Sequence, residues 1–355
     1  MHHPGIPIVA IPARNEESLL PRLLEALSRQ TVLADLPQPL DIIVVLNNTD
    51  DQSGMVARQA VRGASKLRLT VLDVLFPPAQ AHVGHARNLA MDLASGKIGD
   101  RPGTILTTDA DAIPADTWIE ANLRSIRSGA DLVGGRIVGD RREEEMLGPE
   151  FLARAQLYAT YGDLCDRLAS LIDPLDHDPW PRHHDHTGAS LAVRNDVYRR
   201  VGGLDPLPFR EDLGFVAKVQ AAGFRLCHPN DVSVTVSART TGRAKGGMAD
   251  CLTNWIREEQ DGIPARVECP HALARRLDLR RRLRGLDGSP PDLIERKLAE
   301  LGLQPDAAGR MPTIPQLIAR HAAGDPDAAA TVAAPVAIAL LERMIAERWD
   351  MADAA

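Results

Sequence analysis

The chain has 355 residues, 44% of them apolar, which is enough to bury a large core in one main domain and a smaller unit. Its 41 basic and 48 acidic residues give a formal net charge of -7, which excludes a general attraction to nucleic acid. The four cysteines, scattered without a CxxC pair, are typical of a reduced protein. Neither a signal peptide nor an apolar run long enough for a bilayer is present. We therefore expect a cytoplasmic protein without a transmembrane segment.

The first part of the chain alternates short apolar runs with helical segments. The runs, which we interpret as strands, are 6–11, 41–46, 67–72 and 104–106. Helical periodicity follows three of them, at 19–27, up to Arg62, and at 84–94. This alternation predicts an α/β fold with a mainly parallel sheet flanked by helices, and ligands in such folds bind beyond the carboxyl ends of the strands.

Polar loops leave three of these strands at the same edge of the expected sheet. They span 12–17, 47–53 and 107–112. Asn15 or Asp51 alone is more typical of a turn or a helix cap. Three such loops at one edge predict a crevice shared by Asn15, the pair Asn47 and Asn48, and Asp109. The first strand is followed by neither a dinucleotide-binding glycine pattern nor a P-loop, which disfavours both of those classes.

Asp109 and Asp111 stand two residues apart at the end of the fourth strand. Side chains at i and i+2 of an extended segment point to one side, so both carboxylates could bind one hard cation such as Mn²⁺ or Mg²⁺. A cation there would neutralise charge on a nucleotide diphosphate. The alternative is a polar turn ahead of Pro114.

An ordered set of segments resembles the inverting family 2 glycosyltransferases with the GT-A fold. The segments, which fall within about 6–255, are 12–17 (Pro-Ala-Arg-Asn-Glu-Glu), 44–51, 85–90 (His-Ala-Arg-Asn-Leu-Ala), 109–111 (Asp-Ala-Asp), 188–190 with 201–205, and 211–213 (Glu-Asp-Leu). The chain departs from the pattern in three places. Asn47 and Asn48 replace the usual Asp pair, residues 234–237 lack the histidine that many relatives use as a third metal ligand, and the Gln-x-x-Arg-Trp motif of processive enzymes is absent. The last departure favours transfer of a single sugar.

The resemblance implies a nucleotide-diphosphate sugar as donor, with UDP or GDP as the nucleotide, and a hydroxyl acceptor that the sequence does not identify. It implies a divalent cation on Asp109 and Asp111. Together with the basic loop described below, it gives this set of expected donor-binding residues: Pro12, Ala13, Arg14, Asn15, Glu16, Asn47, Asn48, Arg87, Asp109, Ala110, Asp111, Arg239 and Arg243.

Glu211 and Asp212 are the expected catalytic pair. Direct displacement at the anomeric carbon needs one carboxylate to take the proton of the acceptor hydroxyl, and the sugar configuration then inverts. On the resemblance we assign Asp212 as the base and Glu211 as a neighbour that orients the acceptor, although the roles could be exchanged. Without the resemblance, two acids at the start of a helix would simply favour its N-terminal dipole.

Two further loops carry candidate groups. Four histidines, His177, His183, His184 and His186, fall in a Pro-containing stretch without a zinc-site spacing, so we interpret it as a loop over the acceptor pocket. His184, His186 and the later His228 could adjoin a metal. The loop 237–247 carries Arg239, Arg243 and Lys245 among glycines and could close on the diphosphate, or serve only as a solvated basic connector.

Beyond about residue 250 the pattern is helical. Six arginines between 275 and 284 suggest either contact with an anionic membrane surface or, more commonly, a solvated face paired with acids. We expect a GT-A domain at 1–250, with a nucleotide-sugar half 1–112 and an acceptor half 113–250, and a helical region 251–355 that packs on it or forms a homodimer. The functions left open besides the transferase are a non-catalytic nucleotide-sugar-binding relative and a sugar nucleotidyltransferase.

Overall fold

The computed structural model describes residues 5–242, 247–303, 312–323 and 331–353. The chain divides into two compact units. The first comprises Met1–Gln156, Pro181–Val219 and Phe224–Ile263, and the second comprises Leu157–Trp180, Gln220–Gly223 and Pro264–Ala355. The functional division expected at residue 250 stays a prediction.

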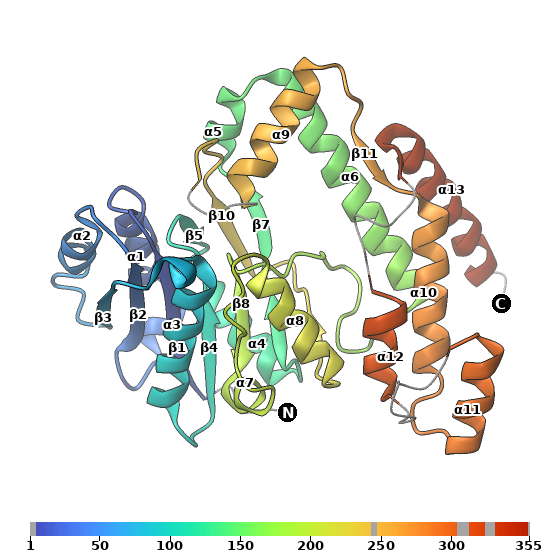
Figure 1. Cartoon of the computed structure of the whole chain (residues 1–355), viewed down its shortest axis with the longest axis horizontal. Helices are drawn as coiled ribbons and strands as arrows, with labels where there is room; N and C mark the ends of the chain where they lie inside the picture. Colours follow the sequence, from blue (N-terminus) through green and yellow to red (C-terminus); the bar gives the residue numbers. More distant parts are fainter. Residues whose placement is uncertain (1–4, 243–246, 304–311, 324–330, 354–355) are drawn as a thin grey trace. The chain divides into compact units, whose positions relative to one another are not determined.

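Within its described residues, the first unit is built on a seven-stranded sheet in the order β3-β2-β1-β4-β8-β6-β9 (Figure 1). Its strands are β1 (Ile6–Ala13), β2 (Leu40–Asn47), β3 (Leu67–Val74), β4 (Gly103–Thr107), β6 (Leu132–Gly134), β8 (Leu191–Arg194) and β9 (Leu226–Cys227). Strands β1 to β4 pair in parallel, whereas β8 runs antiparallel to both β4 and β6. The predicted mainly parallel α/β sheet is therefore confirmed, and all four predicted strands are present.

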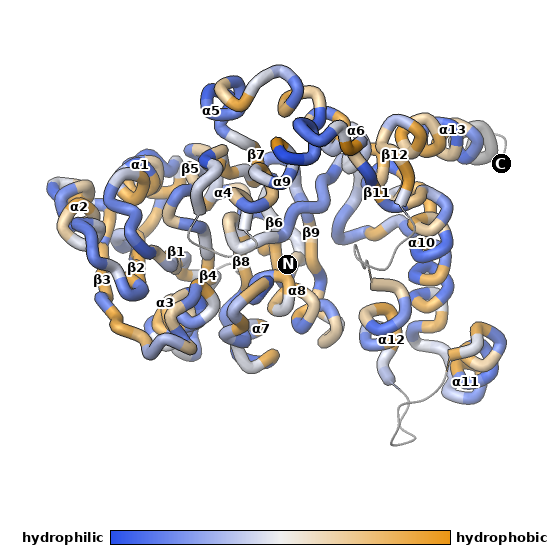
Figure 2. Tube along the Cα trace, turned by 45° about the horizontal axis from the view of Figure 1, so that its top comes forward, coloured by the Kyte–Doolittle hydropathy of each residue, from blue (hydrophilic) through white to orange (hydrophobic). Residues whose placement is uncertain are grey.

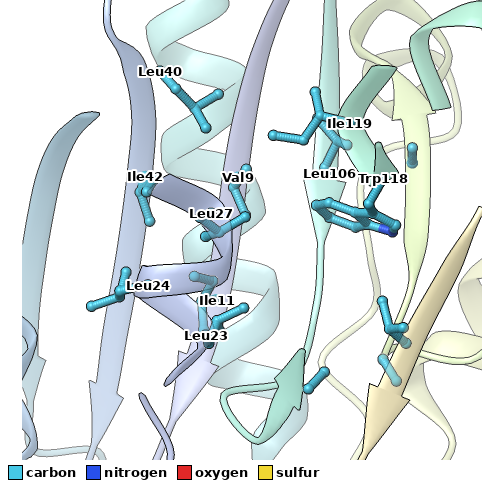
Figure 3. Packing of buried hydrophobic residues seen from close by; sticks show 14 of the residues in the cluster. Val9, Ile11, Leu23, Leu24, Leu27, Leu40, Ile42, Leu106, Trp118 and Ile119 are labelled. Carbon is cyan, nitrogen blue, oxygen red and sulfur yellow. The ribbon is translucent and has the colours of Figure 1, made fainter. Parts of the chain in front are cut away.

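Helices cover both faces of this sheet because alternate residues of its central strands are apolar and buried on opposite sides. Val9 and Ile11 pack in one core with α1 (Leu20–Ser28), α2 (Ser53–Ala60) and α4 (Trp118–Arg127) (Figure 3). Ile8 and Ala10 pack in the other with α3 (Val83–Ile98), α7 (Asn195–Arg200) and α8 (Glu211–Ala221). With both faces covered, the loops at the carboxyl ends of the strands remain accessible to a ligand.

A smaller sheet in the first unit places a late segment of the chain beside the Asp109 turn. Its strand order is β5-β10-β7, with β5 at Ala112–Pro114, β7 at Arg136–Gly139 and β10 at Ser233–Val236. Strand β10 is antiparallel to β5, with Val236 opposite Ala112. The residues that follow β10 therefore lie next to the residues that precede β5.

The remaining elements are mostly helices. They are the short 3-10 helices η1 (Thr31–Ala34) and η2 (Pro78–Gln80), α5 (Arg141–Met146), α6 (Pro149–Ile172), α9 (Met248–Gln260), α10 (Pro270–Arg284), α11 (Pro291–Glu300), α12 (Ile314–His321), α13 (Ala334–Asp353), and the strands β11 (Arg266–Glu268) and β12 (Thr331–Ala333). The helical character expected beyond residue 250 is confirmed, apart from the β11–β12 pair. No helix within the described ranges is long and apolar enough to cross a membrane.

The basic helix α10 has long hydrophilic stretches (Figure 2). Four of its arginines are nevertheless paired with acids within the second unit. Arg276 binds Glu268, Arg284 binds Asp173, and Asp278 binds both Arg281 and Arg282. Each pair neutralises part of the charge that a membrane surface would attract, so the arrangement supports the interpretation of α10 as an acid-paired face.

Candidate active site

The two loops after β1 and β2 are shaped by asparagines. Asn15 and Asn48 have positive φ angles of 53° and 48°, a left-handed conformation that asparagine tolerates better than most residues. Asn15 Oδ1 accepts a hydrogen bond of 3.0 Å from the backbone N–H of Asp50 and so joins the two loops. Asn48 donates to the carbonyl of Phe76 and accepts from its N–H, both at 3.0 Å. These amides fix the loop backbones.

Asn47 differs from its neighbour. It is buried at the end of β2, and its Oδ1 has no hydrogen-bond partner within the described residues. An unsatisfied buried acceptor costs about 1–3 kcal/mol, so the side chain would gain from a donor group supplied by water or by a ligand. Of the two residues expected to bind the base, Asn47 is the one with hydrogen-bonding capacity left.

A buried arginine on α3 connects the expected donor and catalytic motifs. Arg87 Nη2 donates to Asp109 Oδ1 at 2.7 Å, and its Nε donates to Glu211 Oε1 at 2.9 Å. Its Nη1 donates to Thr107 Oγ1 at 3.0 Å and to the carbonyl of Gly188 at 2.9 Å. Four segments far apart in the sequence thus meet at one guanidinium.

The side chain of Arg87 stays protonated despite its burial. Burial opposes the charge, but the carboxylates of Asp109, Glu211 and Asp212 outweigh burial and raise the pKa of Arg87. Burial also raises the pKa of Glu211, against the opposing effect of Arg87. Glu211 is buried against Arg87, and the orienting role expected for it stays a prediction.

Asp212 is the more accessible member of the pair. Its Oδ2 accepts a 2.6 Å hydrogen bond from the N–H of Gly188, and its Oδ1 accepts one of 2.7 Å from the N–H of Leu213. These bonds fix the carboxylate at the start of α8. A Cβ on Gly188 would lie 2.4 Å from Arg87 Nη2, so only glycine allows its backbone to contact both Arg87 and Asp212.

A second guanidinium joins the loop after β10 to the Asp109 turn. Arg239 donates from Nη1 to Glu16 Oε2 at 3.1 Å and from Nη2 to Glu16 Oε1 at 2.8 Å. Its Nη2 also lies 2.8 Å from Asp111 Oδ2. Burial and the neighbouring Asp109 raise the pKa of Asp111 to about 6, although Arg239 acts in the opposite direction. Arg243, expected to bind with Arg239, lies outside the described residues.

Asp109 and Asp111 offer carboxylate oxygens close together, which is the chemistry that Mn²⁺ or Mg²⁺ requires. Burial, and after it the repulsion from Asp109, raises the pKa of Asp111, and a cation would relieve that repulsion. Within the described ranges no group of three or more His, Cys, Asp or Glu side chains could hold a metal ion. A cation bound by the two aspartates would take its other ligands from the diphosphate and water.

The histidines form a cluster of their own in the first unit. His186 Nδ1 lies 3.2 Å from His228 Nε2, and the rings of His183 and His228 are 5.6 Å apart. Burial, with His228 adding to it, lowers the pKa of His183 and of His186 to about 4, so both are neutral at physiological pH. The imidazoles contact one another as a packed polar cluster.

The remaining residues predicted to bind the donor lie in strand β1, in the loop after it and in the core. Pro12 and Ala13 end β1, Arg14 donates from the surface to the carbonyl of Ala81 at 3.3 Å, and Ala110 is buried in the core. Sequence reasoning missed Thr107 as a partner of Arg87, and nothing in the pattern singles it out.

Sequence reasoning also missed the exposed residues Phe209 and Arg210, directly before the expected catalytic pair. Phe209 is 46% exposed, and the guanidinium of Arg210 lies 4.9 Å from the centre of its ring. Arg210 has a φ of 54°, which is unfavourable for an arginine, and its carbonyl accepts from the N–H of Gly214 at 2.9 Å. The scarcity of aromatic residues, 3% of the chain, is the one sequence signal for Phe209.

Residues 8–161 match the model of a family described as Glycosyl transferase family 2. Among solved structures, S. aureus TarS 1-349 in complex with UDP is 14% identical over 80% of this chain and 72% of that chain, with a TM-score of 0.46. Mannosyltransferase PcManGT from Pyrobaculum calidifontis, in complex with GDP-Man and Mn2+, is 14% identical over 89% and 86% of the two chains, with a TM-score of 0.45. Glucosyl-3-phosphoglycerate synthase from Mycobacterium tuberculosis, in complex with Mg2+ and uridine-diphosphate, is 15% identical over 73% and 80%, with a TM-score of 0.40. No curated protein matches the chain.

Proposed function

We propose that the chain, whose residues 8–161 match the model of the family 2 glycosyltransferases, transfers a single sugar from a nucleotide-diphosphate sugar to a hydroxyl acceptor with inversion of configuration. The observation that carries the proposal is the meeting of Asp109, Glu211 and the backbone of Gly188 at Arg87. This contact links the expected donor loop to the expected catalytic pair. A residue set that only bound a nucleotide sugar would have no need to hold a carboxylate such as Asp212 beside the same network.

The donor would lie at the carboxyl ends of β1, β2 and β4. Asp109 and Asp111 would hold a divalent cation with the diphosphate, and that cation would stabilise the charge on the leaving group. Asn47, with its unsatisfied Oδ1, is the residue we assign to the base. Arg87 binds Asp109 directly, so the orientation of the Asp109 carboxylate does not depend on donor binding.

Asp212 is the residue we assign as the general base. The N–H groups of Gly188 and Leu213 orient its carboxylate, and the acceptor hydroxyl would give it a proton as the acceptor oxygen bonds to the anomeric carbon. The bond from that carbon to the diphosphate oxygen breaks on the opposite face, so the configuration inverts. Glu211 then acts through Arg87 as a positioning residue.

The acceptor would approach along Phe209 and Arg210. An exposed aromatic ring next to the base offers an apolar face for a sugar or another ring-bearing acceptor. The left-handed backbone of Arg210 is the kind of local strain found at functional positions. In a Phe209→Ala variant we expect KM for the acceptor to rise several-fold while the donor affinity is unchanged. An unchanged KM would place the acceptor elsewhere.

A donor panel tests the proposal. UDP and GDP sugars would be incubated with Mn²⁺ and with simple sugar and alcohol acceptors, and release of nucleotide diphosphate would be measured with the wild type and with Asp212→Asn. We expect acceptor-dependent release from one class of donor, lost in the variant. Binding of a donor without release under any condition would favour the non-catalytic relative. Release of pyrophosphate from a nucleoside triphosphate and a sugar phosphate would favour the nucleotidyltransferase.

A further inference from the structure

The guanidinium of Arg239 occupies the place where a cation on Asp111 would be expected. It binds both oxygens of Glu16 and lies 2.8 Å from Asp111 Oδ2. The Glu16 carboxylate is buried, and three quarters of the Asp111 and Arg239 side chains are covered. The contact is therefore shielded from solvent, unlike a surface ion pair.

The fold holds Arg239 in this place from a fixed stem. Strand β10 pairs with β5 up to Val236 opposite Ala112, so the chain leaves β10 beside Asp111. Glu143 then accepts hydrogen bonds from Ser237 Oγ at 2.6 Å and from the N–H of Ala238 at 2.8 Å. Arg239 follows directly, and its long side chain can swing about this anchored backbone.

The charges around Arg239 explain why it turns inward. Glu16, Asp109 and Asp111 lie together, and all three carboxylates favour the charged form of Arg239. A guanidinium can neutralise these acids but cannot ligate a metal, because it has no lone pair to donate. A divalent ion bound through Asp111 Oδ2 would bring two cations against each other. Both cannot occupy that oxygen at once.

We propose that Arg239 and the divalent cation are alternative occupants of the Asp111 carboxylate, and that metal and donor binding moves Arg239 from Asp111 to the diphosphate. The inference rests on the proposed function and adds a regulation of the same site. Metal alone must displace Arg239, which then keeps Glu16 as its carboxylate partner. Metal with a nucleotide diphosphate displaces it and offers it the phosphate oxygens, which arginine binds well.

Two consequences follow from the linkage between these equilibria. The metal affinity of the free protein is reduced by the fraction of molecules in which Arg239 leaves Asp111 open. If Arg239 holds Asp111 in roughly nine of ten molecules, the apparent Kd for the metal is about tenfold weaker than without Arg239. Metal and nucleotide diphosphate also bind cooperatively, since each makes the release of Arg239 less costly for the other.

The test titrates Mn²⁺ alone into the full-length protein and four variants, with calorimetry as the readout. Arg239→Gln should bind Mn²⁺ about tenfold more tightly than the wild type. Arg239→Lys, which keeps the charge without the fork of donors, should fall between them. Arg58→Gln removes a positive charge from α2, where the guanidinium donates to the carbonyl of Gly54, and it should change the affinity less than twofold. Asp111→Asn should remove most of the binding.

A second readout separates exchange from a loss of structure. Arg239→Gln removes a bidentate partner of the buried Glu16 carboxylate, so the free variant should unfold at a lower temperature than the wild type. Saturating Mn²⁺ should raise its unfolding temperature by more than it raises that of the wild type. The factor by which UDP or GDP tightens Mn²⁺ binding should be smaller in the variant.

Equal or weaker Mn²⁺ binding by Arg239→Gln, with Asp111→Asn still abolishing it, would overturn the exchange and leave the metal site of the proposed function intact. No Mn²⁺ binding to any protein, even with UDP or GDP present, would overturn the exchange together with the metal dependence. The two failures are therefore distinguishable.

Discussion

The expected donor edge of the first unit, formed by the loops after β1, β2 and β4, and helix α10 of the second unit both pair arginines with acids, yet the pairs are organised differently. At the donor edge, Arg87 and Arg239 serve five carboxylates: Glu16, Asp109, Asp111, Glu211 and Asp212. On α10, two of the pairs are local, because Asp278 is shared by Arg281 and Arg282 on the same helix. The expected donor edge keeps an excess of negative charge in partly buried surroundings, whereas the Asp278 pairs of α10 cancel near solvent.

The comparison teaches where to look for function among many ion pairs. An exposed pair contributes little and attracts no ligand. A partly buried cluster with more acids than bases raises the pKa of one member, as Asp111 shows, and gains from an added cation. Four predictions test this contrast, from the largest expected effect to the smallest.

Arg87→Ala should have the largest effect on folding. The change leaves the buried carboxylate of Glu211 and that of Asp109 without their common partner, so we expect a loss of about 3–5 kcal/mol in the free energy of unfolding. Urea denaturation measures it. A loss below about 1 kcal/mol would mean that the network at Arg87 contributes no more than a surface pair.

Asp212→Asn should lower transfer by roughly 10²-fold or more while the donor still binds. Asparagine keeps the size of the side chain and an acceptor for the Gly188 N–H, but it cannot take the proton. Steady-state rates at saturating acceptor and calorimetry with the donor check both halves. Near-full transfer would leave Asp212 as only a helix start, and a more severe loss in Glu211→Gln with donor affinity intact would exchange the two roles.

Asp111→Asn should weaken Mn²⁺-dependent binding of nucleotide diphosphate and, in the free protein, stabilise the fold at neutral pH. The pKa of Asp111 is raised to about 6 when folded, so its ionised form costs stability above that pH. The gain in the variant should be at most about 3 kcal/mol near pH 7.5, shrink as the pH falls through 6, and vanish near pH 4. Urea unfolding across this range measures it. A variant less stable than the wild type at neutral pH would contradict the sign.

Arg282→Gln on α10 should have the smallest effect. Its partner Asp278 keeps Arg281, and both arginines are largely exposed, so the free energy of unfolding should change by no more than about 0.5 kcal/mol. The binding of this variant to vesicles of anionic lipid should not differ from that of the wild type. Clear vesicle binding that the variant loses would restore the membrane interpretation of α10.

Much of the fold could be predicted because the central strands are continuous apolar runs, such as Ile8 to Ile11, with polar loops at one edge. The antiparallel strand β8 could not be, because four residues have too little pattern to fix a direction. The 24-residue helix α6 was also missed, since its buried residues do not fall in one clear stripe.

The candidate site was predictable as a set of residues but not as a set of contacts. Motif spacing indicated Asp109, Asp111, Glu211 and Asp212 separately. Arg87 binds both Asp109 and Glu211 because α3 packs on the sheet beside them. No local sequence pattern encodes that packing. The contact between Arg239 and Glu16 joins residues 223 positions apart and depends on the pairing of β10 with β5.

The configuration of the transferred sugar tests the central claim most directly. Proton-coupled carbon NMR of the glycoside product distinguishes the two anomers by the one-bond coupling constant between C1 and H1. Direct displacement with Asp212 as base predicts the anomer opposite to that of the donor, formed by the wild type and lost with Asp212→Asn. A product with the configuration of the donor would contradict the mechanism and the role given to Asp212.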